Sequence, residues 1–178
     1  KLRKIISKKM TSDEEKQWLR QKFLEYKVKK GDVNELKTRI DIIPNSIVLA
    51  QAANESGWGS SRFAREFNAL FGEYTYDYSN GVVPLLREEG EKHLVKAFES
   101  VDKSIQSYFN NLNSHYAYEN FREVRKIMRE KNNFSNIKLL VDELDSYAAD
   151  TNYIETINSI IDVNKYFIDL SSLYTPKT

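Results

Sequence analysis

The sequence contains no cysteine, and this absence removes several kinds of chemistry from consideration. Without cysteine the chain can form no disulfide, use no thiolate nucleophile and build no cysteine-ligated metal site. Histidine is also scarce, since His93 and His115 are the two that occur and their separation in the sequence makes a poor zinc site. Catalysis by this chain would therefore depend on carboxylates or hydroxyl groups, and we expect no metal and no cofactor.

A strong charge of one sign and long apolar runs are absent as well. The formal net charge is +1, from 27 basic and 26 acidic residues, so charge gives no general argument for a nucleic-acid partner. Apolar runs are too short to span a bilayer, and no secretory signal with a small-residue cleavage site is found, so we expect no transmembrane segment. The basic segment 1–10 is expected to be a solvated tail.

The remaining length predicts one helical domain. A chain of 178 residues with 40% hydrophobic content fits a single core, which we place over residues 11–178. Ser12 followed by Glu15 gives the capping-box pattern of a first helix. Helical spacing or capping signals predict further helices over Val33–Arg39, from Pro44 to Glu55, after Ser60 or Ser61, in several segments from Val101, over 137–147, and from about Asp150 onward.

The periodicity changes between Gly72 and Ser100. Tyr74 and its neighbours are strand formers, Asn80-Gly81 is a strong turn signal, and β-branched and aromatic residues resume over 92–98. We therefore predict a mainly α fold (α+β) with a small antiparallel β-hairpin lobe inserted around residues 72–100.

The segment 49–64 is the most informative part of the chain, because an alanine-rich helix runs into one carboxylate, Glu55, and then breaks at Gly57. A buried acid in the last turn of a helix lies near electronegative carbonyl groups, so its protonated form is favoured, as a general acid requires. Trp58 can supply a flat apolar wall that raises a carboxyl pKa or stacks on a sugar ring. The alternative is an ordinary helix end with Trp58 in the core and Glu55 in solvent.

The run QAANESGWGSSRF, residues 51–63, continues into FNALFG, residues 67–72. Together these motifs resemble the signature of the bacterial glucosaminidase domains of glycoside hydrolase family 73. The stretches 64–75 and 90–95 are similar to its Bax-like branch, and the resemblance extends from about Pro44 to the helix after Tyr153. It implies a lysozyme-like fold, cleavage of peptidoglycan glycan strands, and a protein exported to the periplasm or cell envelope. We expect it to act as a monomer.

The resemblance also implies roles for individual residues. Glu55 would be the catalytic proton donor, and a second acid would come from the β-lobe, where Glu88 and Glu89 rank above Glu91. The segment from Tyr147 to Tyr153 matches the family's groove-lining pattern Tyr-Ala-x-Asp-x-x-Tyr. The expected substrate-binding residues are Trp58, Asn68, Phe71, Tyr147 and Tyr153. Asn68 could equally be a helix cap. Glu73 could line the groove, but a surface residue at a strand start is the favoured expectation for it.

The expected activity is that of an endo-β-N-acetylglucosaminidase acting on peptidoglycan. A lytic transglycosylase, which uses one glutamate in a similar fold, and a non-catalytic peptidoglycan-binding domain are the alternatives. Two mechanisms stay open. Either a second carboxylate activates water with inversion, or the substrate's 2-acetamido oxygen attacks with retention of configuration.

Overall fold

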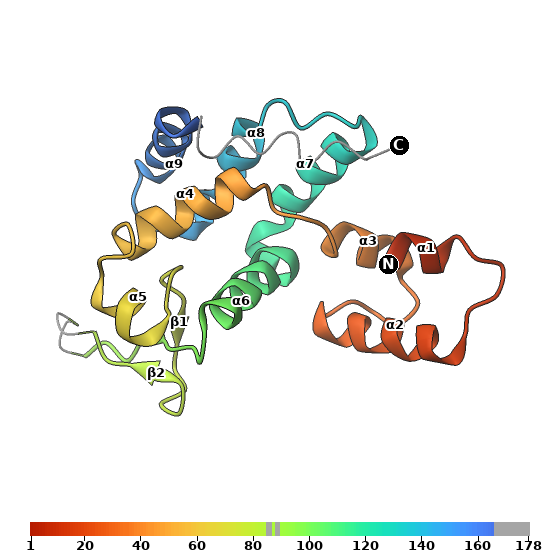
Figure 1. Cartoon of the computed structure of the whole chain (residues 1–178), viewed down its shortest axis with the longest axis horizontal. Coiled ribbons are helices and arrows are strands. Elements are labelled where there is room, and N and C mark those ends of the chain that lie inside the picture. Colours follow the sequence, from red (N-terminus) through yellow and green to blue (C-terminus); the bar gives the residue numbers. More distant parts are fainter. Residues whose placement is uncertain (85–86, 88–89, 166–178) are drawn as a thin grey trace. The chain divides into compact units, whose positions relative to one another are not determined.

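The computed structural model describes residues 1–84, 87 and 90–165, and the chain divides into two compact units that alternate along the sequence. The first unit comprises Lys1–Ile43 and Asn110–Thr151, and the second comprises Pro44–Phe109 and the chain from Asn152 onward. Figure 1 labels their helices and two of the strands. The expectation of one catalytic domain over 11–178 stays a prediction.

The first unit is helical throughout its described elements. Three helices come from its N-terminal part: α1 (Leu2–Ile6), α2 (Asp13–Glu25) and α3 (Val33–Arg39). Its C-terminal part holds the end of α6 (Val101–Ser114), the short helix η1 (Tyr116–Tyr118), α7 (Glu119–Glu130), α8 (Lys138–Val141) and η2 (Asp142–Tyr147). The capping box at Ser12 and Glu15 is present, and α3 has the bounds that the sequence predicted.

Part of the basic N-terminal segment is helical. Residues 2–6 form α1, in which Leu2 and Ile5 are buried. Leu2 joins a hydrophobic cluster with Phe23 and Leu36. The two apolar residues lie three positions apart on one face of α1, whereas Arg3 and Lys4 between them are exposed.

A buried arginine organises the first unit. The Arg125 guanidinium donates to the carbonyl oxygens of Thr38 (2.8 Å) and Ile42 (3.0 Å) and to Oδ1 of Asn113 (2.7 Å). Burial lowers the pKa of Arg125 to about 10, so the group stays charged at neutral pH. Its hydrogen bonds tie α7 to the end of α3, to the segment that follows it and to α6.

The helix predicted over 137–147 is interrupted. It forms α8 and then η2, with non-helical dihedral angles at Glu143 and Leu144. Although the helix is interrupted, the apolar side chains of Leu140, Val141 and Leu144 are buried. The apolar pattern therefore predicted the buried face correctly but not the break.

The second unit carries the β-lobe. Its helices are α4 (Asn45–Ser56), α5 (Arg62–Phe67), the first part of α6 and α9 (Tyr153–Val163), and α4 packs against α9 (Figure 1). Its strands are β1 (Tyr74–Thr75), β2 (Gly81–Val82) and β3 (Leu94–Lys96). Among the helices of the described residues, none combines the length and the apolar character that crossing a membrane requires.

The three strands form an antiparallel sheet in the order β1-β3-β2. The sequence placed a turn at Asn80-Gly81, yet β1 and β2 do not pair with each other, and both pair with the return strand. Leu94 and Val95 of β3 are buried, which explains why the apolar return strand takes the centre. The predicted fold class is confirmed: a mainly α chain with a small antiparallel sheet.

Candidate active site

Glu55 lies in the last turn of α4. This helix starts after Pro44 and buries Ile47, Ala50 and Gln51 along one face. It ends at Gly57, whose φ of 57° is in the left-handed region that closes many helices. Beyond it, the backbone N–H of Gly59 donates to Ser56 Oγ (2.7 Å). The Ser-Gly-Trp-Gly motif is therefore a tight helix stop directly after the carboxylate.

The Glu55 carboxyl is half-buried, so the alternative of a fully solvated side chain is wrong. Burial raises the pKa of Glu55, and hydrogen bonds from Asn54 and Tyr153 partly offset this increase. Asn54 Nδ2 donates to Glu55 Oε1 at 3.2 Å. On the other side the backbone of Gly72 is close, since a Cβ atom at that position would lie 3.1 Å from Glu55 Oε2.

A chain of buried hydrogen bonds leads to Glu55 from the interior of the second unit. The Tyr108 hydroxyl donates to Gln51 Oε1 (2.5 Å), and Gln51 Nε2 donates to the Tyr153 hydroxyl oxygen (2.7 Å). Tyr153 in turn bonds to the Glu55 carboxyl. Because the Tyr153 oxygen accepts from Gln51, its own hydrogen is directed to the carboxylate. The sequence predicted Tyr153 but missed Gln51 and Tyr108, whose only signal was a polar group on an apolar stripe.

Two residues predicted to bind substrate have structural roles in this unit. Phe71 is 2% exposed and stacks on Tyr108 with ring centroids 4.1 Å apart, so it packs in the interior of this unit, and its contact with substrate stays a prediction. Asn68 closes α5 with a φ of 54°, and its Nδ2 donates to the carbonyl oxygen of Phe98 (2.9 Å). The structure thus favours the helix-cap alternative for Asn68, and its contact with substrate stays a prediction.

Trp58 is 67% exposed, which excludes the alternative that it belongs to the core. Its role in sugar binding stays a prediction, as does that of Tyr147, whose ring lies in the first unit 6.2 Å from that of Tyr118. Of the candidate second acids, Glu88 and Glu89 lie outside the described residues. Glu91 is exposed and pairs with His93 at 3.2 Å.

Glu73 was expected at the surface, and this expectation is wrong. Its side chain is 13% exposed, accepts a hydrogen bond from the Ser107 hydroxyl (2.7 Å) and lies 3.7 Å from the Lys96 ammonium. Burial raises the pKa of Glu73, against the opposing effects of Ser107 and Lys96. This burial has no local signal in the sequence, because Ser107 is 34 positions away in α6.

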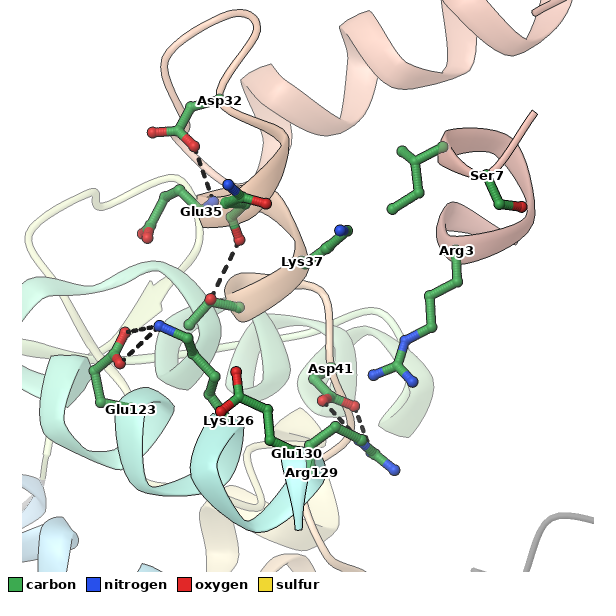
Figure 2. A pocket seen from close by; sticks show the side chains of 13 residues that line it. Arg3, Ser7, Asp32, Glu35, Lys37, Asp41, Glu123, Lys126, Arg129 and Glu130 are labelled. Atoms are coloured by element: carbon green, nitrogen blue, oxygen red, sulfur yellow. Dashed lines mark hydrogen bonds and ion pairs between the residues drawn. The ribbon is translucent and has the colours of Figure 1, made fainter. Parts of the chain in front are cut away.

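In the described part of the chain, no group of three or more His, Cys, Asp or Glu side chains is arranged to hold a metal ion. A cavity of about 850 Å³ lies in the first unit, among α1, α3 and α7. Figure 2 shows two ion pairs among its lining side chains, Arg129 with Asp41 (2.6 Å) and Lys126 with Glu123 (3.0 Å). None of the predicted site residues lines this cavity, so the candidate site remains the surroundings of Glu55.

Comparison with known proteins shows the family to which this chain belongs. A profile of the glucosaminidase family, described as mannosyl-glycoprotein endo-beta-N-acetylglucosaminidase, matches residues 30–166. The chain belongs to the glucosaminidase family. All the members of the hydrogen-bond chain, together with Glu73, lie within the residues that the family profile matches, whereas α1 and α2 precede them.

Two curated relatives support the same assignment. The glucosaminidase chain is 36% identical to protein Bax of Escherichia coli (strain K12) over 116 residues, which is 65% of this chain and 40% of that protein. It is 26% identical to exo-glucosaminidase LytG of Bacillus subtilis (strain 168) over 145 residues, 78% of this chain and 49% of that protein. The chain therefore spans less than half the length of either relative. No solved structure is significantly similar.

Proposed function

We propose that this glucosaminidase is a peptidoglycan hydrolase, an endo-β-N-acetylglucosaminidase in which Glu55 is the general acid. The observation that carries the proposal is the environment of Glu55: a half-buried carboxyl with a raised pKa, at the end of a helix, bonded to a buried tyrosine. Family membership supplies the substrate class, because cleavage after N-acetylglucosamine requires such an acid beside the bridging oxygen.

The surroundings of Glu55 favour the protonated carboxyl before cleavage and stabilise the carboxylate that forms when the proton is transferred. Before cleavage, burial and the carbonyl groups at the end of α4 favour the protonated carboxyl near neutral pH. As the bond to the leaving sugar breaks, Glu55 transfers its proton to the bridging oxygen and becomes a carboxylate. Asn54 and Tyr153 then donate hydrogen bonds to the new charge, so they stabilise the transition state more than the ground state.

The reaction also needs a second acid or an oriented acetamido group. Glu88 or Glu89 is the proposed second acid, with Glu91 ranked below them. If this acid activates water, its carboxyl should lie roughly 6.5 to 9.5 Å from that of Glu55 when substrate is bound. If the 2-acetamido oxygen attacks instead, a tyrosine such as Tyr147 need only orient the amide. Trp58 offers an exposed ring for sugar stacking in either case.

We propose that the protein works outside the cytoplasm, in the periplasm or cell envelope, because peptidoglycan is the proposed substrate. The relative from Bacillus subtilis is named an exo-glucosaminidase, which favours a second possibility, attack from strand ends. Long glycan strands distinguish the two modes. An endo-acting enzyme shortens the average strand before small products accumulate, whereas an exo-acting enzyme releases small products from the start.

The test is digestion of purified peptidoglycan followed by mass spectrometry. The wild-type chain should release fragments with hydrated N-acetylglucosamine ends, and Glu55→Gln should reduce their release about 100- to 10,000-fold, the usual contribution of a general acid. Glu14→Gln, at an exposed position of α2, is the matched control and should retain full activity. Products lighter by one water would show a lytic transglycosylase, and binding without release would show a non-catalytic domain.

A further inference from the structure

Glu73 is an unexpected feature of the second unit, because a glutamate at a strand start is usually solvated. We infer that Glu73 is a positioning residue for the catalytic acid, since it fixes the Gly72 backbone that covers the Glu55 carboxyl. This inference rests on the proposed role of Glu55 and adds a positioning residue to the mechanism.

Glu73 is anchored to two other elements. Its Oε2 accepts a hydrogen bond from Ser107 Oγ of α6 (2.7 Å), and Lys96 Nζ of β3 donates to the same hydroxyl (2.7 Å). The Lys96 ammonium also forms an ion pair with Glu73 Oε2 (3.7 Å), and the Lys96 backbone N–H donates to the Glu73 carbonyl oxygen (2.8 Å). Both the side chain and the backbone of Glu73 are thereby fixed.

Because Glu73 is fixed, the backbone of the preceding residue, Gly72, is also held in place beside Glu55. Phe71 and Glu73 flank Gly72, and they contact consecutive residues of α6, because Phe71 stacks on Tyr108 and Glu73 bonds to Ser107. Gly72 is therefore held between two attachments to one helix. It has a φ of 62°, and it approaches Glu55 Oε2 so closely that a Cβ atom there would be 3.1 Å away.

A contribution to folding stability does not explain why a carboxylate is buried at Glu73. In the described chain, Glu73 Oε1 is buried without a hydrogen-bond partner, and burial disfavours the ionised form. A buried carboxylate with an unsatisfied oxygen costs free energy of folding that an apolar side chain of similar size does not. A residue that reduces stability beside a catalytic acid is better explained by its effect on that acid.

Loss of the Glu73 anchor should change the titration of Glu55. If Gly72 is released, water reaches the carboxyl, and the pKa of Glu55 falls toward its ordinary value because desolvation is the largest cause of its increase. In the described part of the chain, Tyr153 and Lys96 are the titratable groups that contact Glu55 and Glu73 respectively. Neither is removed by a substitution at Glu73.

The experiment compares Glu73→Met and Glu73→Gln with the wild-type chain on soluble peptidoglycan fragments. For Glu73→Met we expect kcat to fall about 10- to 100-fold for a misplacement of up to 1 Å, with KM little changed. The basic limb of the pH profile of kcat/KM, which reports the general acid, should move to lower pH. The melting temperature at pH 7 should be unchanged or higher. Glu73→Gln, which keeps the bond to Ser107, should retain more activity than Glu73→Met.

Val141→Ala in the first unit is the control for reduced stability, because it should lower the melting temperature and leave the basic limb in place. The inference would be overturned if the basic limb of the kcat/KM profile of Glu73→Met lay at the same pH as in the wild-type chain. A kcat of Glu73→Met equal to that of the wild-type chain would overturn it as well. An inactive wild-type chain would instead contradict the proposed function. In that case carbon NMR titration of the Glu55 carboxyl still tests the inference, since its pKa should be lower in Glu73→Met.

Discussion

The close approach of Gly72 to Glu55 gives a sharp prediction for the variant Gly72→Ala. Alanine at this position would take a left-handed conformation, which costs an L-residue about 1 to 2 kcal/mol. For a chain of this size each kcal/mol corresponds to about 2 to 4 °C, so the melting temperature should fall by about 2 to 8 °C. The new methyl group would stand 3.1 Å from Glu55 Oε2, so the carboxyl must also move by a few tenths of an ångström.

The displacement of the carboxyl should be visible in the rate. Since a misplacement of about 1 Å can cost about 100-fold in rate, we expect a kcat about 4- to 10-fold lower for Gly72→Ala. The assay is the release of reducing ends from peptidoglycan, together with thermal unfolding of the same preparation. Gly31→Ala is the matched control, because Gly31 also has a positive φ (94°) but a Cβ atom there would meet nothing within 4 Å.

The Gly31→Ala control separates the effect of backbone strain from that of displacing the Glu55 carboxyl. Gly31→Ala should lower the melting temperature by a comparable amount and leave kcat unchanged. The reasoning is refuted if Gly72→Ala retains wild-type kcat, or if both variants lose activity to the same extent.

Two further predictions concern single hydrogen-bonding groups. Tyr153→Phe removes a hydrogen bond that lowers the pKa of Glu55. The basic limb of the kcat/KM profile should therefore move to higher pH, and kcat should fall. An unchanged profile would contradict the role of Tyr153. Arg125→Met leaves buried carbonyl oxygens of the first unit without their donor, so the free energy of unfolding should fall by about 2 to 5 kcal/mol in urea titration. Lys126→Met, at the next and exposed position, should change it by less than about 0.5 kcal/mol.

Local signals in the sequence predicted the features that depend on neighbouring residues. The capping box at Ser12, the bounds of α3 and the helix stop after Glu55 were confirmed, because each follows from residues within one or two turns. The family motif then directed attention to Glu55 and Tyr153. Their bond joins α4 to α9 and could not be derived from spacing alone.

Features that depend on distant contacts were missed. Glu73 has the local pattern of a solvated strand residue, and its burial is decided by Ser107 and Lys96 on other elements. The turn signal at Asn80-Gly81 does not give the strand order, because the pairing of both outer strands with β3 depends on the buried Leu94. The core role of Phe71 likewise requires Tyr108.

The most direct test of the central claim is the pKa of the Glu55 carboxyl in the free protein, measured by carbon NMR titration with Glu55→Gln to assign the resonance. We predict a value clearly above about 4.3, the ordinary glutamate pKa, because burial beside Gly72 outweighs the hydrogen bonds from Asn54 and Tyr153. A value at or below the ordinary one would contradict the account, since Glu55 would then hold no proton to donate near neutral pH.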